Sequence, residues 1–166
     1  MKPYVSGTGS PMYYASRIAK KKYPEAKVVF IGPCIAKRKE AQRDECVDYV
    51  MTFEELHSVF RGLGIELAQA NPYKVAYESV CEAHGFAQAG GVAGAVKSYL
   101  GPKADGIKML QFSDFNKKSI GQMRAWAKTG KVDAQFIEMM ACEGGCVTGP
   151  SAYNDSVSGK SQLNQD

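Results

Sequence analysis

The chain has 166 residues, enough for one domain with a hydrophobic core, and its 45% hydrophobic and 23% charged residues are typical of a globular protein. Its 21 Lys and Arg residues are spread along the sequence and give a net charge of only +4, which argues against a nucleic-acid-binding surface. A run of about 18 apolar residues is absent, as is a signal-peptide pattern, so we expect a cytoplasmic protein with no membrane partner. Its five cysteines are then expected to stay reduced.

Turn residues and apolar periodicity divide the chain into helices that alternate with strands. Ser10 and Thr52 are typical helix N-caps, and Glu55 completes a capping box with Thr52. The continuous apolar run at 27–32 is typical of a strand buried on both faces of a parallel sheet. Helices are predicted at residues 10–23, 36–43, 52–61, 88–100 and 116–129. Strands are predicted at residues 27–32, 47–51, 106–112 and 135–139.

This alternation predicts an α/β fold with a mostly parallel four-stranded sheet flanked by helices. We expect residues 1–150 to form this domain. Residues 151–166 are rich in Ser, Asn, Asp and Gln and are expected to form a disordered tail.

Two cysteine-bearing loops each follow a predicted strand. Cys142 and Cys146 flank a glycine pair, which lets the backbone curl tightly and approach inorganic sulfur. Cys34 follows an earlier strand, and the nearby Lys37 favours its thiolate form. In proteins with parallel sheets, bound molecules lie just beyond the carboxyl ends of the strands. The two cysteine loops could therefore meet at the same end of the predicted sheet. The pattern points to an iron–sulfur site with three cysteine ligands.

The sequence leaves other roles open. The cysteine pair could be structural thiols in a turn. A structural zinc site usually needs four ligands, and neither His57 nor His84 lies near a cysteine in the sequence. Nucleophilic catalysis by a cysteine has no obvious histidine partner. Cys46 and Cys81 have no comparable setting and are interpreted as incidental thiols.

Taken together, the two loops resemble the catalytic domain of iron-only, or [FeFe], hydrogenases. The family motif Pro-Cys-x-x-Lys-x-x-Glu is matched from Pro33 to Glu40. The motif Glu-x-Met-Ala-Cys-x-Gly-Gly-Cys is matched from Glu138 to Cys146, and a family-like glycine-rich turn lies between Phe86 and Val92. The likeness spans residues 10–149 and implies that the chain is one lobe of that catalytic domain.

The resemblance also implies roles for the matched residues. The implied ligands of a [4Fe–4S] cluster are Cys34, Cys142 and Cys146. Cys146 would also bridge to a two-iron unit that carries CO and cyanide, and the two parts together form the H-cluster. Lys37 would donate a hydrogen bond to a cyanide, Glu40 would belong to the proton-transfer route, and Met140 would pack beside the two-iron unit.

The sequence departs from the family pattern in three places. The motif Thr-Ser-Cys-Cys-Pro, which supplies a fourth ligand, would lie before residue 1, so we expect a fragment whose partner is the N-terminal remainder of the same polypeptide. Gly32 stands where active members usually have methionine, which is similar to the sensory branch of the family. Gly149-Pro150-Ser151 replaces the usual glycine run.

We therefore expect a fragment of an iron-only hydrogenase-like protein that contributes three ligands to an H-cluster for reversible H₂ oxidation and proton reduction. The isolated fragment is expected to be inactive, with its cluster absent or incomplete. The expected further partner is a ferredoxin-like electron donor or a signalling domain. The alternative is a non-catalytic sensory, regulatory or cluster-binding module.

Overall fold

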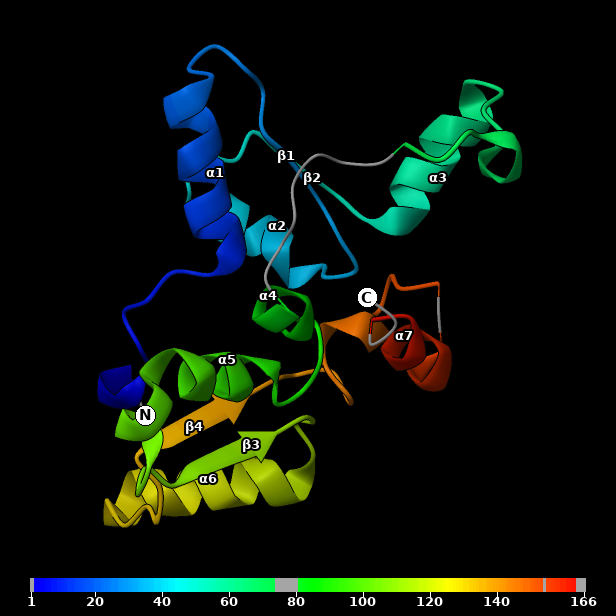
Figure 1. Ribbon diagram of the computed structural model, residues 1–166. Coiled ribbons are helices and arrows are strands. Elements are labelled where there is room, and N and C mark those ends of the chain that lie inside the picture. The colour runs from blue at the N-terminus through cyan, green and yellow to red at the C-terminus, as the bar shows by residue number, and fades with distance from the viewer. Residues whose placement is uncertain (1, 74–80, 154, 164–166) are drawn as a thin grey trace. The chain divides into compact units, whose positions relative to one another are not determined.

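The structure is a computed structural model that describes residues 2–73, 81–153 and 155–163 (Figure 1). These residues form two compact units. The N-terminal unit comprises residues 2–72 and 150–153, and the C-terminal unit comprises residues 73, 81–149 and 155–163. Each unit contains one pair of parallel strands and one of the two cysteine loops. No helix within the described ranges is long and apolar enough to cross a membrane.

The N-terminal unit is built on a β–α–β crossover. Strand β1 (Val29–Ile31) pairs in parallel with β2 (Tyr49–Met51), and helix α2 (Ala36–Ala41) connects them. In this pairing, Val29 lies opposite Tyr49. The other elements of the unit are the short 3₁₀ helices η1 (Lys2–Tyr4) and η2 (Leu67–Gln69) and the helices α1 (Pro11–Lys22) and α3 (Phe53–Gly62).

The predicted helix caps of this unit are confirmed. Ser10 Oγ accepts the N–H of Tyr13 at 3.3 Å and begins α1. Thr52 Oγ1 accepts the N–H of Glu55 at 3.2 Å, and the Glu55 carboxylate accepts the N–H of Thr52 at 2.8 Å. The reciprocal pair satisfies two backbone donors at the start of α3, as a capping box does.

Asp48 joins three segments of the N-terminal unit just before β2. Its carboxylate accepts the backbone N–H of Val28 at 2.8 Å and pairs with Lys20 at 2.9 Å and with Lys27 at 3.0 Å. The hydrogen bond from Val28, followed by those from the two ammonium groups, holds the pKa of Asp48 well below its ordinary value. The folded unit therefore favours the ionised carboxylate.

Replacing Asp48 by Asn is expected to lower the urea midpoint of unfolding at pH 7. A carboxyl whose pKa falls on folding stabilises a protein above its unfolded pKa, about 3.9, and this stabilisation is lost as the pH falls through the folded value. The difference between the urea midpoints of wild type and variant should therefore become smaller as the pH falls from about 5 to about 2.5. Asp105→Asn, at an exposed position, is the control and should leave the midpoint almost unchanged. A gap of equal size at both pH values would contradict the assignment.

The C-terminal unit has the same β–α–β arrangement. Strand β3 (Met109–Phe112) pairs in parallel with β4 (Phe136–Met139), and helix α6 (Lys117–Thr129) connects them. In Figure 1, helix α5 (Gly91–Leu100) covers one face of this sheet and α6 covers the other. The other elements are α4 (Cys81–Gly85), η3 (Gly101–Ala104), η4 (Cys146–Thr148) and α7 (Ser156–Leu163).

The α/β fold is confirmed, but the strands do not form the predicted sheet. The described strands form two sheets of two strands rather than one sheet of four. Strand β1 pairs only with β2 and β3 only with β4 among the described strands, and the two pairs belong to different units. The expectation of a strand at 27–32 buried on both faces is wrong, because Val29 and Ile31 alternate onto an open face and are 42% and 41% exposed.

The segment expected to be a disordered tail contains helix α7. Asp155 begins this helix by accepting the N–H groups of Val157 and Ser158 at 2.8 and 3.0 Å. Before it, Ser151 is buried. An aspartate N-cap is a local signal for the start of a helix. The polar composition of the same segment favours disorder, and the two signals therefore make opposite predictions here.

Candidate metal centre

The loop from Cys142 to Cys146 begins directly after β4. Met140 extends the pairing of that strand by donating its N–H to a carbonyl of β3 at 2.7 Å. Gly144 and Gly145 then take φ angles of 80° and 108°, which residues with a side chain rarely adopt. The N–H of Gly145 donates to Cys142 O at 3.1 Å and closes the turn. Both cysteines are half-buried, and η4 begins at Cys146.

This cysteine loop packs tightly on the turn formed by residues 86–90. The N–H of Ala89 donates to Gly144 O at 3.0 Å, and the N–H of Val147 donates to Ala87 O at 2.9 Å. A Cβ on the second glycine of the loop would lie 2.6 Å from both Ala87 O and Ala89 N. Only glycine fits that position, so the glycine-rich turn seen in the sequence is the surface on which the cysteine loop is held.

Glu138 is a buried residue whose role was not predicted from the sequence. It lies in β4 and is only 6% exposed. Its carboxylate accepts the N–H of Gly90 at 2.9 Å and the N–H of Ala93 at 2.8 Å, and so caps the start of α5. The signal that could have identified it is a carboxylate inside an apolar strand, because a buried carboxylate needs hydrogen-bond partners.

The loop that carries Cys34 begins directly after β1. Gly32 extends the pairing of β1 by donating its N–H to Met51 O at 3.1 Å. The N–H of Lys37 donates to Cys34 O at 3.2 Å and turns the chain into α2. Ser151 donates its N–H to the carbonyl of the residue before Cys34 at 3.3 Å, a contact that no local pattern in the sequence indicates. Cys34 itself is half-buried.

Lys37 and Glu40 form an ion pair one turn apart on α2. Lys37 Nζ lies 2.5 Å from Glu40 Oε2, and the hydroxyl of Ser10 donates to the other carboxylate oxygen. Partial burial alone would raise the pKa of the Glu40 carboxyl, but the hydrogen bonds from Lys37 and Ser10 outweigh it and lower the pKa below its ordinary value. Glu40 is therefore ionised at neutral pH and is held by two donors.

The predicted site residues fall into two groups. Cys34, Lys37 and Glu40 lie in the N-terminal unit, whereas Met140, Cys142 and Cys146 lie in the C-terminal unit. Within the described part of the chain, no three His, Cys, Asp or Glu side chains lie close enough to hold one metal ion. Each half of the predicted site is thus defined within its own unit.

The other two cysteines differ from these three. Cys46 is half-buried and follows Asp44, whose carboxylate accepts its N–H at 3.0 Å in a tight turn before β2. Cys81 begins α4, and its side chain lies outside the described residues. Neither Cys46 nor Cys81 lies beside a pair of glycines, as Cys142 and Cys146 do.

The donor chemistry of the two loops fits an iron–sulfur cluster. None of the four described cysteine side chains is in a disulfide, so thiolates can form. The glycine pair between Cys142 and Cys146 lets the loop close on itself and pack against the 86–90 turn, with one cysteine at each end of the loop. Of the two histidines, His57 lies against Tyr153, with ring centroids 5.7 Å apart and ring planes tilted by 58°.

Solved [FeFe]-hydrogenases share this fold. A variant of apo [FeFe]-hydrogenase HydA1 from Chlamydomonas reinhardtii is 20% identical with a TM-score of 0.65, and the match covers 98% of this chain and 59% of that one. An [FeFe]-hydrogenase studied for oxygen inactivation of its H cluster is 22% identical with a TM-score of 0.62, covering 98% and 58%. HydA(deltaEFG), which captures a stage of H-cluster assembly, is 20% identical with a TM-score of 0.61, covering 98% and 59%. The chain thus spans less than two thirds of the length of these proteins.

A family comparison covers nearly the whole chain. Residues 1–150 match the model that describes the C-terminal domain of the iron only hydrogenase large subunit. The matched range includes both cysteine loops, the glycine-rich turn and the Lys37–Glu40 pair. The chain therefore belongs to the family formed by the C-terminal domains of iron-only hydrogenases.

Proposed function

We propose that Cys34, Cys142 and Cys146 of this chain would hold the [4Fe–4S] part of an H-cluster, with Cys146 also serving its two-iron unit. The observation that carries the proposal is the Cys142–Cys146 loop, whose glycine pair is held against the 86–90 turn by backbone hydrogen bonds. It is supported by the position of Cys34, which likewise follows a parallel strand.

When bound, the H-cluster supplies the redox chemistry of reversible H₂ oxidation and proton reduction. Lys37 Nζ would donate a hydrogen bond to an anionic cyanide ligand of the bound group, because an ammonium group has three donors and only part of this capacity is used by Glu40. In the proton-transfer route, the ionised Glu40 carboxylate would take up a proton from a donor on one side and release it to an acceptor on the other. The Ser10 hydroxyl, which already carries its own proton, would hold the carboxylate in place by its hydrogen bond. Met140, the residue directly after β4, would pack its side chain beside the bound cluster.

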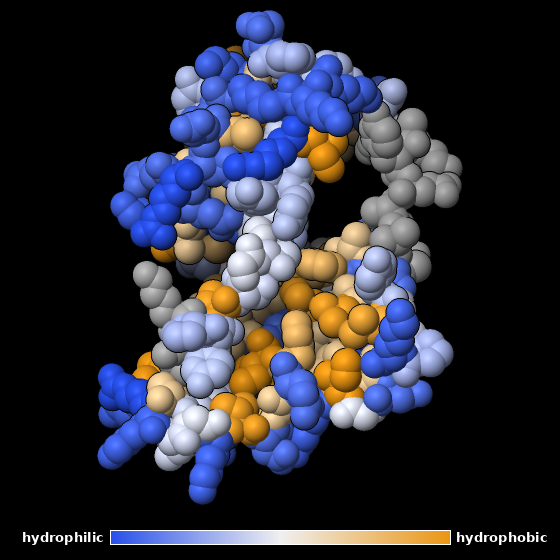
Figure 2. Space-filling model, turned by 90° about the vertical axis from the view of Figure 1, so that its left-hand side faces the viewer, coloured by the Kyte–Doolittle hydropathy of each residue, from blue (hydrophilic) through white to orange (hydrophobic). Residues whose placement is uncertain are grey.

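In this proposal the N-terminal remainder of the same polypeptide completes the site and covers apolar surface. The support is the exposed face of the β1–β2 sheet, where Val29, Ile31 and Tyr49 are 42%, 41% and 59% exposed. Figure 2 shows a further gathering of hydrophobic residues on one face of the C-terminal unit, in the lower part of that view. Electrons or a signal would pass to a ferredoxin-like donor or a signalling domain. We propose no nucleic-acid partner.

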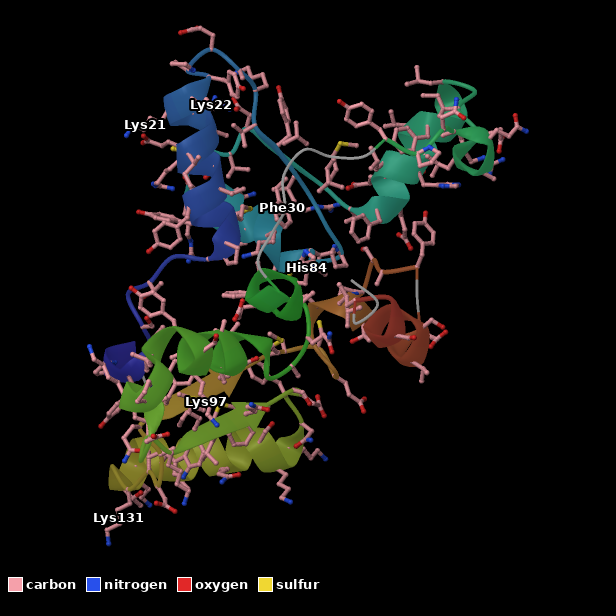
Figure 3. All side chains as sticks on the ribbon, in the orientation of Figure 1. Lys21, Lys22, Phe30, His84, Lys97 and Lys131 are labelled. Carbon is pink, nitrogen blue, oxygen red and sulfur yellow. The ribbon has the colours of Figure 1, made fainter. Side chains whose placement is uncertain are left out.

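A second candidate function is a sensory or regulatory module that binds the cluster without rapid turnover. The observation that favours it is the surroundings of Gly32. A Cβ on Gly32 would lie 3.0 Å from the ring of Phe30, which is labelled in Figure 3. The place of the methionine found in active relatives is therefore crowded by an aromatic ring, and methionine there would require Phe30 to move.

The deciding experiment is H₂-dependent dye reduction by the full-length protein carrying this domain, after maturation of its two-iron unit. The catalytic proposal expects turnover, with the infrared bands of CO and cyanide confirming assembly in the same sample. The 166-residue chain alone is the negative control and should be inactive. Bands of an assembled two-iron unit without turnover would exclude the catalytic function and favour the sensory one.

A further inference from the structure

The N-terminus of α5 is capped from the neighbouring strand and not from its own sequence. Its N-cap residue, Gly90, has a φ of 91° and no side chain with which to cap the helix. The carboxylate of Glu138 takes that role: one oxygen accepts the N–H of Gly90 and the other that of Ala93. A charged acceptor at a helix N-terminus is favourable, and in a buried setting its hydrogen bonds are strong.

The capped end of α5 continues into the turn that holds the cysteine loop. Gly90 is the last residue of the 86–90 turn, and its neighbour Ala89 donates to Gly144 O. At the other side of the turn, Ala87 O accepts the N–H of Val147. One short segment is thus fixed at its C-terminal end by Glu138 and presents two hydrogen bonds to the loop.

We propose that Glu138 is the positioning residue of the cysteine loop: by fixing Gly90 and Ala93 it sets the 86–90 turn, which in turn fixes Cys142 relative to Cys146. The loop also follows β4, the strand that contains Glu138. Glu138 is therefore linked to the loop in two ways: along the chain through β4, and by hydrogen bonds through the start of α5 and the 86–90 turn. Its effect on a bound cluster rests on the proposed function, but its effect on the loop does not.

Amide hydrogen exchange of the 166-residue chain tests this coupling. In Glu138→Ala, the amides of Gly90 and Ala93 should exchange faster because they lose their acceptor. The proposal also expects the amides of Ala89 and Val147 to exchange faster by about tenfold or more, although these amides donate to Gly144 O and Ala87 O and not to Glu138. Faster exchange at Gly90 and Ala93 alone would overturn the proposal and reduce Glu138 to a helix cap.

Two further variants keep the test decisive. Glu138→Gln retains the length and one acceptor oxygen, so exchange at Ala89 and Val147 should be intermediate between wild type and Glu138→Ala. Asp105→Asn removes an exposed carboxylate of the same unit that lies outside the turn and the cysteine loop, and it should leave all these amides unchanged. The amide of Ile120 in α6, which belongs to the same unit but lies outside the turn and the cysteine loop, reports whether a variant unfolds that unit as a whole. If Glu138→Ala does not fold, Glu138→Gln is compared with wild type alone. Faster exchange at Ala89 and Val147 then supports the proposal, and wild-type exchange at both amides overturns it.

The consequence for the cluster is measured in the full-length protein. The electron paramagnetic resonance spectrum of its reduced cluster should broaden or shift in Glu138→Gln and stay unchanged in Asp105→Asn. A wild-type protein without any cluster would defeat the proposed function, while the exchange experiment would still decide the role of Glu138. A wild-type cluster signal with an unaltered Glu138→Gln spectrum would defeat only the positioning role.

Discussion

Gly91→Ala is expected to lower the free energy of unfolding by about 3 kcal/mol or more, the range of a steric overlap that the backbone must absorb. Gly91 is the first residue of α5, and a Cβ there would overlap the carbonyl of Gly85 at the end of α4. The obstacle is backbone, so no side-chain rotation can relieve it. The turn that holds the cysteine loop lies between these two glycines and would be displaced as well.

Gly94→Ala is the matched control in the same helix. No atom lies within 4 Å of a Cβ at Gly94, and alanine in a helix interior is favoured over glycine by about 0.5–1 kcal/mol. Urea unfolding followed by circular dichroism should therefore move the midpoint down for Gly91→Ala and slightly up for Gly94→Ala. Equal effects of the two substitutions would show that α4 and α5 are not in close contact.

Local signals made much of the fold predictable. Ser10 before Pro11 and the Thr52–Glu55 box determine helix starts through hydrogen bonds only three residues apart, and both were confirmed. Asn116 and Gly130 bound α6 in the same way, since the first caps its N-terminus and the second takes a φ of 68° at its end. Such elements need no knowledge of distant contacts.

What the sequence did not reveal depends on pairings between distant segments. The run at 27–32 is apolar on both faces, but whether both faces are covered depends on what packs there, and Val29 and Ile31 lie on an open face. The number of strands in a sheet is likewise a tertiary property. Helix α7 was not predicted, because the polar composition of residues 151–166 favoured disorder more strongly than the single capping residue Asp155 favoured a helix.

The candidate site shows the same division. The two cysteine loops were predicted to follow strands, and they do. The contacts that hold them were not predicted, because they join segments far apart in the chain: Glu138 with Gly90, and Val147 with Ala87. Periodicity and spacing carry no information on such contacts, whereas a carboxylate in an apolar strand was the one available hint.

Serine in place of Cys146 is expected to abolish H₂-dependent dye reduction by the full-length protein, by at least about a hundredfold, because even substitutions that only support a metal ligand weaken such sites tenfold to a hundredfold. The serine hydroxyl is similar in size to the thiol but loses its proton far less readily, so it would be a poorer ligand for the iron of a cluster. Cys142→Ser should reduce the activity similarly.

Cys46→Ser is the control for these substitutions. Cys46 lies in the turn before β2 and is not among the proposed ligands, and its N–H bond to Asp44 involves only the backbone of residue 46. Activity close to that of the wild type is expected. A loss as large as that of Cys146→Ser would mean that the ligand set has been assigned wrongly.

Iron content measured together with the electron paramagnetic resonance spectrum of the reduced full-length protein tests the ligand assignment most directly. Wild type and Cys46→Ser should give the same iron content and the same [4Fe–4S] signal. Cys34→Ser, Cys142→Ser and Cys146→Ser should each lose iron and lose or alter that signal. An intact wild-type signal in any of these three variants, or its loss in Cys46→Ser, would contradict the proposal that Cys34, Cys142 and Cys146 hold the cluster.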